Sequence, residues 1–211
     1  MSGGVWDLLF IPSLFLPEGT VKRVLLLGVG GGAVIRQYLT FLPIEAMTGV
    51  ELDPTHIKVA RQHFGVRQRN VELISADAIN WVASYRGPGF DIVIEDLFTE
   101  REGEPVRVIQ ASEDWFGSLR SLLRPGGALI INFEDSAQLR ASGAAYQKAV
   151  GGGVNCVYGF TLPSYGNCVG AFLPTVIPRT ILRSRLDKLL VSYPATRQSA
   201  QKFRIRQLSG K

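Results

Sequence analysis

The sequence predicts an α/β domain whose sheet is mostly parallel and is closed by an antiparallel hairpin toward the C-terminus. Short apolar runs alternate with amphipathic segments between residues 21 and 150, which is the pattern of consecutive βαβ units. The last two apolar runs are joined only by residues 163–166, and so short a connection favours an antiparallel pair. At 211 residues, the chain is long enough for one such domain to bury its own core.

The individual elements follow from these runs and from the residues that bound them. We expect strands at 24–27, 46–51, 71–75, 90–94 and 128–133, and hairpin strands at 155–162 and 167–173. Helices are expected at 33–41, 54–64, 78–81, 112–123 and 136–150. Asp53 and Pro54 are a start signal for the second helix, as a cap and a first helical residue. The charged segment around 99–105 has no regular pattern, so we expect an irregular loop there.

The two ends of the chain differ from this central domain, which we assign to 21–175. Residues 1–20 are expected to form a cap, because their apolar stretch is broken by Pro12, lacks a basic lead and is shorter than the roughly 20 residues that span a bilayer. Cys156 and Cys168 are too few for a disulfide framework, and although they could approach each other we interpret them as buried thiols. These features predict a soluble cytoplasmic protein without membrane contact.

The remaining part, residues 176–211, is predicted to form a basic helix and tail. It holds nine Lys or Arg and one acid, whereas residues 1–175 hold fourteen Lys or Arg and seventeen acids. Such a segment could bind the phosphates of a nucleic acid, with Tyr193 and Phe203 interleaved among the cations. The alternative is a solvated helix and a frayed tail. The cations concerned are Arg179, Arg183, Lys188, Arg197, Lys202, Arg204 and Arg206.

A glycine cluster directly follows the first strand and precedes the first helix of the domain. Gly28, Gly30 and Gly32 let the backbone approach a ligand closely, and the amides at the start of the helix are hydrogen-bond donors. Together with Ala33 the cluster also fits the dinucleotide-binding pattern, and a tight turn without a ligand is the plain alternative. The cluster therefore predicts a Rossmann-like nucleotide site.

Acidic residues at the ends of the second and third strands fit a bound nucleoside. Glu51 can accept both ribose hydroxyl protons, which is the usual reason for an acid at this place. Asp53 is interpreted mainly as a helix cap and otherwise as a second ribose ligand. Asp77 can accept the exocyclic amine of adenine while the small Ala78 lets a backbone amide meet the ring, although Asp77 also suits a helix cap.

The fourth strand ends in two adjacent acids, Glu95 and Asp96, where the reacting centre would lie. Adjacent side chains on a strand point to opposite faces, so only one of them can face the site. We assign Asp96 as the catalytic base because it lies at the strand edge, where a neighbouring negative charge can raise its pKa. Glu95 and Tyr165, on the hairpin turn, are candidate contacts of the acceptor substrate. The alternative is that both acids are solvated loop residues.

With these residues identified, the chain resembles the spermidine synthase family. The glycine motif at 24–36, the ribose strand end at 50–53, the adenine turn at 75–78 and the catalytic strand at 90–96 occur in the family's order. Residues 123–127 and 162–166 are similar to its later landmarks, so the resemblance covers about 21–172. It implies a class I methyltransferase-type sheet and a donor that is S-adenosylmethionine or its decarboxylated form.

Three departures from the family concern recognition of the amine. The family has an acid where this chain has Gly31, and a second acid three residues after the catalytic one, where this chain has Thr99. Only about 20 residues precede the first strand, where the family carries a β-hairpin domain. Losing two charge-assisted contacts would weaken diamine binding on the order of 100-fold.

These departures lead us to expect a methyltransferase that uses S-adenosylmethionine on an unidentified small-molecule acceptor. The alternative is an aminopropyltransferase that uses decarboxylated S-adenosylmethionine and in which Glu95 or Glu100 replaces the missing acids. A further alternative is a nucleoside- or RNA-binding module without turnover. An NAD-dependent enzyme would explain the glycines and Glu51 only. We expect no metal site, and a homodimer is possible.

Overall fold

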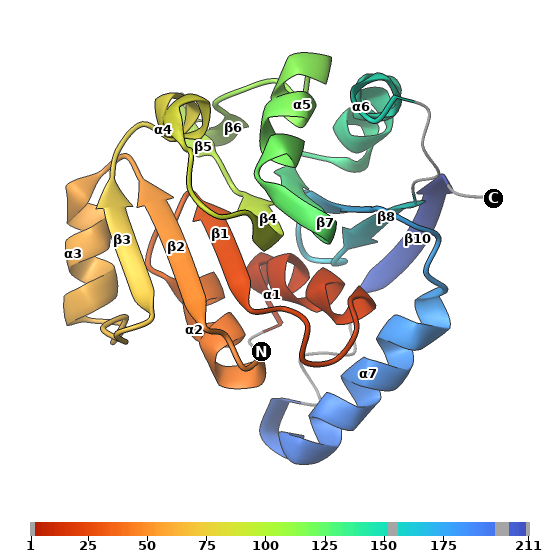
Figure 1. The fold of residues 1–211 in the computed structure, drawn as a ribbon, viewed down its shortest axis with the longest axis horizontal. Coiled ribbons are helices and arrows are strands. Elements are labelled where there is room, and N and C mark those ends of the chain that lie inside the picture. Colours follow the sequence, from red (N-terminus) through yellow and green to blue (C-terminus); the bar gives the residue numbers. More distant parts are fainter. Residues whose placement is uncertain (1–2, 152–155, 197–202, 210–211) are drawn as a thin grey trace.

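The computed structural model describes residues 3–151, 156–196 and 203–209, and it is built around one large mixed sheet (Figure 1). The strand order is β10-β8-β9-β7-β4-β1-β2-β3. Strands β7, β4, β1, β2 and β3 are parallel, and β9, β8 and β10 pair antiparallel. The predicted fold class is therefore confirmed. The strands are β1 Arg23–Leu27, β2 Ala46–Glu51, β3 Val71–Ser75, β4 Phe90–Glu95, β7 Leu123–Phe133, β8 Cys156–Thr161, β9 Cys168–Leu173 and β10 Arg204–Ser209.

Helices cover both faces of this sheet. One face packs against α1, α2, α3 and α7, and the other face packs against α4, α5 and α6. Along β1, Leu26 belongs to the first core while Leu25 and Leu27 belong to the second, because side chains of a strand alternate between faces. This explains why the central strands are continuously apolar. The helices are α1 Val5–Phe10, α2 Ala33–Phe41, α3 Pro54–Gln62, α4 Ala78–Ser84, α5 Glu113–Ser121, α6 Ser136–Ala149 and α7 Arg179–Ser192.

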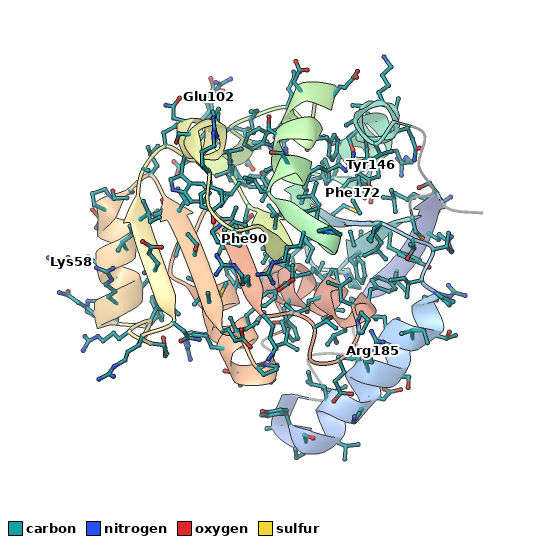
Figure 2. All side chains as sticks on the ribbon, in the orientation of Figure 1. Lys58, Phe90, Glu102, Tyr146, Phe172 and Arg185 are labelled. Carbon is teal, nitrogen blue, oxygen red and sulfur yellow. The ribbon has the colours of Figure 1, made fainter. Side chains whose placement is uncertain are left out.

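Aromatic side chains fill the core beneath α5 and α6. Figure 2 shows Tyr146 of α6 and Phe172 of β9 beside each other, with ring centroids 4.6 Å apart. Phe116 of α5 contacts both rings, at 5.2 and 5.0 Å. Packing of this kind fixes the position of the α5–α6 layer over β7 and β9, the strands that carry part of the candidate site.

The N-terminal segment packs inside the first core. Its helix α1 is followed by the 3-10 helix η1 (Ile11–Phe15), and Phe10 meets Tyr38 of α2 edge-on at 5.3 Å. Arg185 of α7, labelled in Figure 2, donates hydrogen bonds to the carbonyl oxygens of Leu14, Phe15 and Leu16. Helix α7 thereby binds the carbonyl groups at the end of η1.

Two sequence-based expectations about irregular segments were wrong. The segment around 99–105 is a hairpin of β5 (Phe98–Arg101) and β6 (Glu104–Arg107), with a tight turn at Glu102 and Gly103, both of positive φ. The tail is not frayed at 204–209, because β10 pairs with β8 and extends the sheet. Arg197 and Lys202 lie outside the described residues. A short 3-10 helix, η2 (Pro194–Thr196), follows α7.

The other expected elements are present, most of them with small shifts at their ends, but β7 begins at Leu123, five residues before the expected start at 128. The C-terminal hairpin is confirmed at 156–161 and 168–173, while Asn155 lies outside the described residues. Cys156 and Cys168 are buried free thiols. In the part of the chain that the structure describes, no helix has both the length and the apolar character needed to cross a membrane.

Candidate functional site

The candidate site lies at the carboxyl edge of the sheet, where β1 and β4 are neighbours. The chain leaves β1 toward one face and β4 toward the other, and ligands of open α/β sheets bind at such a switch point. The amide of Asp96 donates to the carbonyl oxygen of Leu27 at 2.8 Å, so the two strand ends are joined. At Gly28, which has φ +86°, a Cβ atom would lie 2.2 Å from the carbonyl oxygen of Asp96. Only glycine permits this approach.

Glu51, at the end of β2, binds backbone amides of the glycine loop through its carboxylate. Its Oε2 accepts hydrogen bonds from the backbone amides of Val29 and Gly30, at 2.8 and 2.9 Å. Its Oε1 accepts the amide of Asp53 at 3.1 Å and lies 3.3 Å from Nδ1 of His56. Burial acts to raise the pKa of Glu51, but the three amides outweigh it and hold that pKa below its ordinary value. Glu51 is thus an ionised group that organises the loop, and its contact with a ribose stays a prediction.

The other acids expected to hold a nucleoside are helix caps. At the start of α3, Asp53 accepts a hydrogen bond from the backbone amide of Thr55 at 2.7 Å. At the start of α4, Asp77 accepts one from the backbone amide of Asn80 at 2.8 Å. A cap uses one carboxylate oxygen, so a ligand can still meet the other. The small Ala78 is buried directly after Asp77. Their roles toward adenine and ribose stay predictions.

The space around Gly32 is filled by neighbouring side chains, whereas the space around Gly30 is open. Gly32 is the residue before α2, with φ +78°, and a Cβ there would lie 2.8 Å from Cγ2 of Val66. The close packing of α2 against the segment after α3 therefore requires this glycine. At Gly30 a Cβ would meet no atom within 4 Å, which leaves open space above the loop.

Asp96 is the half-buried carboxylate at the centre of the site. Its Oδ1 accepts a hydrogen bond from Nδ2 of Asn132 at 2.8 Å, and Oδ1 of Asn132 lies 3.4 Å from Nδ2 of Asn167. Burial raises the pKa of Asp96 to about 6, the Asn132 bond opposes this, and the neighbouring charge of Glu95 adds to it. A carboxylate with such a pKa is ionised at neutral pH and is basic enough to accept a proton.

Glu95 points the other way, into the core, as the alternation along a strand requires. Its side chain has no exposed surface and its Oε2 lies 2.5 Å from Nη2 of Arg107. Nε1 of Trp115 lies 3.4 Å from the same oxygen, and the amide of Leu97 donates to Oε1 at 3.1 Å. The structure therefore does not support Glu95 as a contact of the acceptor, because its carboxylate is enclosed and already paired.

Comparison with known proteins identifies the family. A family model described as the spermine/spermidine synthase domain matches residues 8–173. The chain belongs to this family. A polyamine aminopropyltransferase of Aeropyrum pernix is 30% identical over 167 residues, which are 75% of this chain and 52% of that protein. One from Vibrio vulnificus is 27% identical over 78% of this chain and 54% of its own length. The chain thus spans about half the length of these curated relatives.

Solved structures show the same fold. The human methyltransferase-like protein 13, solved in complex with SAH, has 18% identity and a TM-score of 0.74, and the match covers 90% of this chain and 92% of that one. A spermidine synthase from Thermotoga maritima has 19% identity and a TM-score of 0.62, with 82% and 60% covered. At such identities the likeness concerns the fold alone.

Membership of the spermine/spermidine synthase family corrects the leading functional expectation. The prediction of a methyltransferase was wrong, since the family match and the curated relatives indicate aminopropyl transfer. That prediction relied on Gly31 and Thr99, where acids were missing. Two positions at the margin of a site carry less information than the whole matched domain, whose sheet is shared by both chemistries.

The sequence analysis did not identify two residues that contact the site, Asn132 and Arg107. Asn132 is a buried polar residue within the apolar run of β7, and such a residue is a signal that could have been read. Arg107 gave no signal because its segment was interpreted as a loop. Tyr165 lies in the β8–β9 turn, two residues before Asn167, and the residue is 42% exposed. Among the described residues, no three His, Cys, Asp or Glu side chains gather as metal ligands.

Proposed function

We propose that this chain transfers an aminopropyl group from decarboxylated S-adenosylmethionine to an amine. The observation that carries the proposal is the position of Asp96, next to the glycine loop at the β1–β4 switch point of a chain from the spermine/spermidine synthase family. The donor is a cationic nucleoside, and the acids Glu51, Asp77 and Asp96 lie at the carboxyl edge of the sheet, at or just after the ends of β2, β3 and β4. The residues present therefore fit such a donor.

In the reaction, the residues of the chain position two substrates and remove one proton. The donor supplies a carbon next to its sulfonium, and the C–S bond breaks as the new C–N bond forms, leaving a neutral thioether. Asp96 accepts the proton that the attacking amine loses, and the hydrogen bond from Asn132 orients the carboxylate for it. Alignment of the amine with the donor carbon provides much of the acceleration.

The second ammonium group of a diamine needs a carboxylate other than Glu95. Glu95 is enclosed by Arg107, whereas Glu100 on β5 is exposed in the hairpin that directly follows the catalytic strand. We assign Glu100 to this role in place of the acid missing at Thr99. Replacing Glu100 by Gln is expected to raise KM for a diamine while kcat changes little, because the group acts on binding and not on the reacting nitrogen.

The proposal is tested by incubating the protein with decarboxylated S-adenosylmethionine and a panel of linear diamines and triamines. Release of methylthioadenosine measures turnover, and mass spectrometry of the amine identifies the group transferred. Asp96→Asn should reduce kcat by about 10²–10⁴-fold. Asp114→Asn is the matched control, because Asp114 is an exposed acid on α5 outside the site. Equal turnover by wild type and Asp96→Asn would show that Asp96 is not the base.

A pH profile provides a second test of the same residue. The pKa of Asp96 is raised to about 6, so kcat/KM should rise with pH and reach half of its maximum near that value. Methyl transfer from S-adenosylmethionine to any of the amines, without aminopropyl transfer, would contradict the proposed function.

A further inference from the structure

One buried ion pair next to the site has no role in the proposed reaction. The side chains of Glu95 on β4 and Arg107 on β6 are 0% and 3% exposed, and their nearest charged atoms are 2.5 Å apart. Such a pair is a weak source of stability, because removing two charges from water offsets most of their attraction. The role of this ion pair is therefore to be sought in the other contacts that Arg107 makes.

Arg107 binds two residues that adjoin Asp96, although no hydrogen bond joins Arg107 to Asp96 itself. The guanidinium binds the carboxylate of Glu95, which precedes Asp96 in the chain. It also donates to the carbonyl oxygen of Asn132, the residue whose side-chain amide binds Asp96. In addition, the backbone amide of Arg107 donates to Oε1 of Glu134 at 2.7 Å. One side chain thus binds both residues that determine where the Asp96 carboxylate lies.

Arg107 also connects the β5–β6 hairpin to the sheet. It pairs with Phe98 at the base of the hairpin, and the amide of Val108 donates to the carbonyl oxygen of Leu97 at 3.0 Å. Its guanidinium lies over the ring of Phe133 on β7, 4.9 Å from the centroid. The hairpin, whose tip carries Glu102 in Figure 2, is therefore held to β4 and β7 by this residue.

We infer that Arg107, paired with Glu95, is a positioning residue that orients Asp96 and sets the pH range in which Asp96 can accept a proton. Its importance for turnover rests on the proposed function. Its effect on the Asp96 carboxylate does not, because that effect follows from the contacts in the free protein.

The charged groups that act on Asp96 come from three elements. Glu95 of β4 and Glu51 of β2 are negative and raise the pKa of Asp96, whereas Arg107 of β6 lowers it; Asn132 of β7 adds a hydrogen bond that lowers it. Removing the charge of Glu95 should therefore lower this pKa, and removing that of Arg107 should raise it. Opposite shifts would show that both charges of the pair act on the Asp96 carboxylate.

The first experiment titrates Asp96 in the free protein, without substrate. The carboxyl carbon of Asp96 is followed by NMR between about pH 4 and 9, a range that brackets its raised pKa, and is assigned by its loss in Asp96→Asn. Glu95→Gln should move the midpoint to lower pH, Arg107→Met to higher pH, and the double variant Glu95→Gln/Arg107→Met back toward wild type. Arg101→Met is the control on the same hairpin, where Arg101 is exposed. Unchanged midpoints, or shifts in one direction, would overturn the inference.

The double variant keeps the test decisive if a single variant fails to fold. It removes both charges together, and replacing a buried pair by neutral groups is often neutral or stabilising. The glutamine side chain of Glu95→Gln can still accept hydrogen bonds from Trp115 and Leu97. The NMR signals of the Asn132 side-chain amide report whether its hydrogen bond to Asp96 persists. If these signals have the same chemical shifts in the double variant as in wild type, Arg107 does not position Asp96.

The second experiment measures aminopropyl transfer by the double variant. Here kcat should fall on the order of 10- to 100-fold, because a small misplacement of a catalytic group has an effect of this size, while KM for the donor stays the same. An unchanged kcat would contradict the positioning role. If wild type itself transfers nothing, the proposed function fails, and the titration of Asp96 still decides the inference about Arg107.

Discussion

Asp96 illustrates at the scale of one residue how a site can work against the stability of its own fold. Its pKa is about 6 in the folded protein and 3.8 in a free side chain. The folded state therefore binds the proton more tightly than the unfolded state does. The resulting stability is fully present below pH 3.8 and is lost as the pH rises through about 6. At neutral pH the ionised carboxylate makes the fold less stable.

Asp96→Asn is accordingly expected to stabilise the protein at pH 8 while it abolishes most of the activity. The pKa difference corresponds to at most about 3 kcal/mol in the free energy of unfolding. Asparagine keeps an oxygen that accepts the bond from Asn132. Urea unfolding at about pH 8, 6 and 4 measures the effect. The gain should shrink near pH 6 and vanish below about pH 4, and a gain independent of pH would exclude ionisation as its cause.

Gly28 and Gly30 allow a matched test of the glycine loop. Both have positive φ, at +86° and +49°, but only at Gly28 would a Cβ collide, with the carbonyl oxygen of Asp96. Gly30→Ala should cost about 1–2 kcal/mol of stability, from its backbone conformation alone. Gly28→Ala should cost clearly more, because β1 and β4 must also separate. Urea unfolding compares the two variants, and equal losses would show that the close approach does not matter.

At the scale of the elements, the sequence predicted those that have strong apolar patterns. Strands β2 and β3 and helix α2 have the bounds that the sequence predicted. Strands β5 and β6 have four residues each and are rich in charge, so no period was visible. Strand β10 is also polar and owes its conformation to pairing with β8. That partner lies far back in the chain, beyond the reach of a local pattern.

The site was predicted where a residue type and its place at a strand end were enough. Asp96 was expected at the strand edge and lies there, and the cap roles of Asp53 and Asp77 were considered beforehand. What could not be predicted depends on contacts between distant segments. The pair of Glu95 and Arg107 spans two strands, one of which was not expected at all.

Arg185 provides a prediction about how two elements at opposite ends of the chain are joined. Its guanidinium binds three consecutive carbonyl groups where η1 ends. Arg185→Met should lower the free energy of unfolding by about 1.5–3 kcal/mol, since these are hydrogen bonds from a charged donor. Lys188→Met is the control on the same helix, because Lys188 pairs with Glu18 where both side chains are largely exposed, and the loss of this pair should matter little. Equal losses would contradict this role of Arg185.

At the scale of the whole molecule, half of the described cations in the basic C-terminal part contact other groups of the chain. Arg185 binds η1, Lys188 pairs with Glu18, and Arg183 lies over the ring of Phe203 at 4.4 Å from its centroid. The exposed Arg204 and Arg206 remain on the edge strand β10. A nucleic-acid partner and a homodimer stay predictions. Three of the six cations of this part that the structure describes therefore contact other groups of the chain.

The acids at the carboxyl edge predict which donor the whole molecule binds. Decarboxylated S-adenosylmethionine lacks the negative carboxylate of S-adenosylmethionine, so the acids near Asp96 should repel it less. A ligand at about 100 times its Kd adds about 2.7 kcal/mol to the stability of the folded state. In a chain of this size, that raises Tm by roughly 5–10 °C.

Thermal unfolding with decarboxylated S-adenosylmethionine, S-adenosylmethionine and NAD in parallel makes this comparison. The decarboxylated donor should raise Tm the most and NAD should not raise it. A larger shift with S-adenosylmethionine would mean that the acids at the edge do not select the donor, since the extra carboxylate would then be bound and not repelled. The open loop at Gly30 would in that case be the part of the site to examine for a group that binds it.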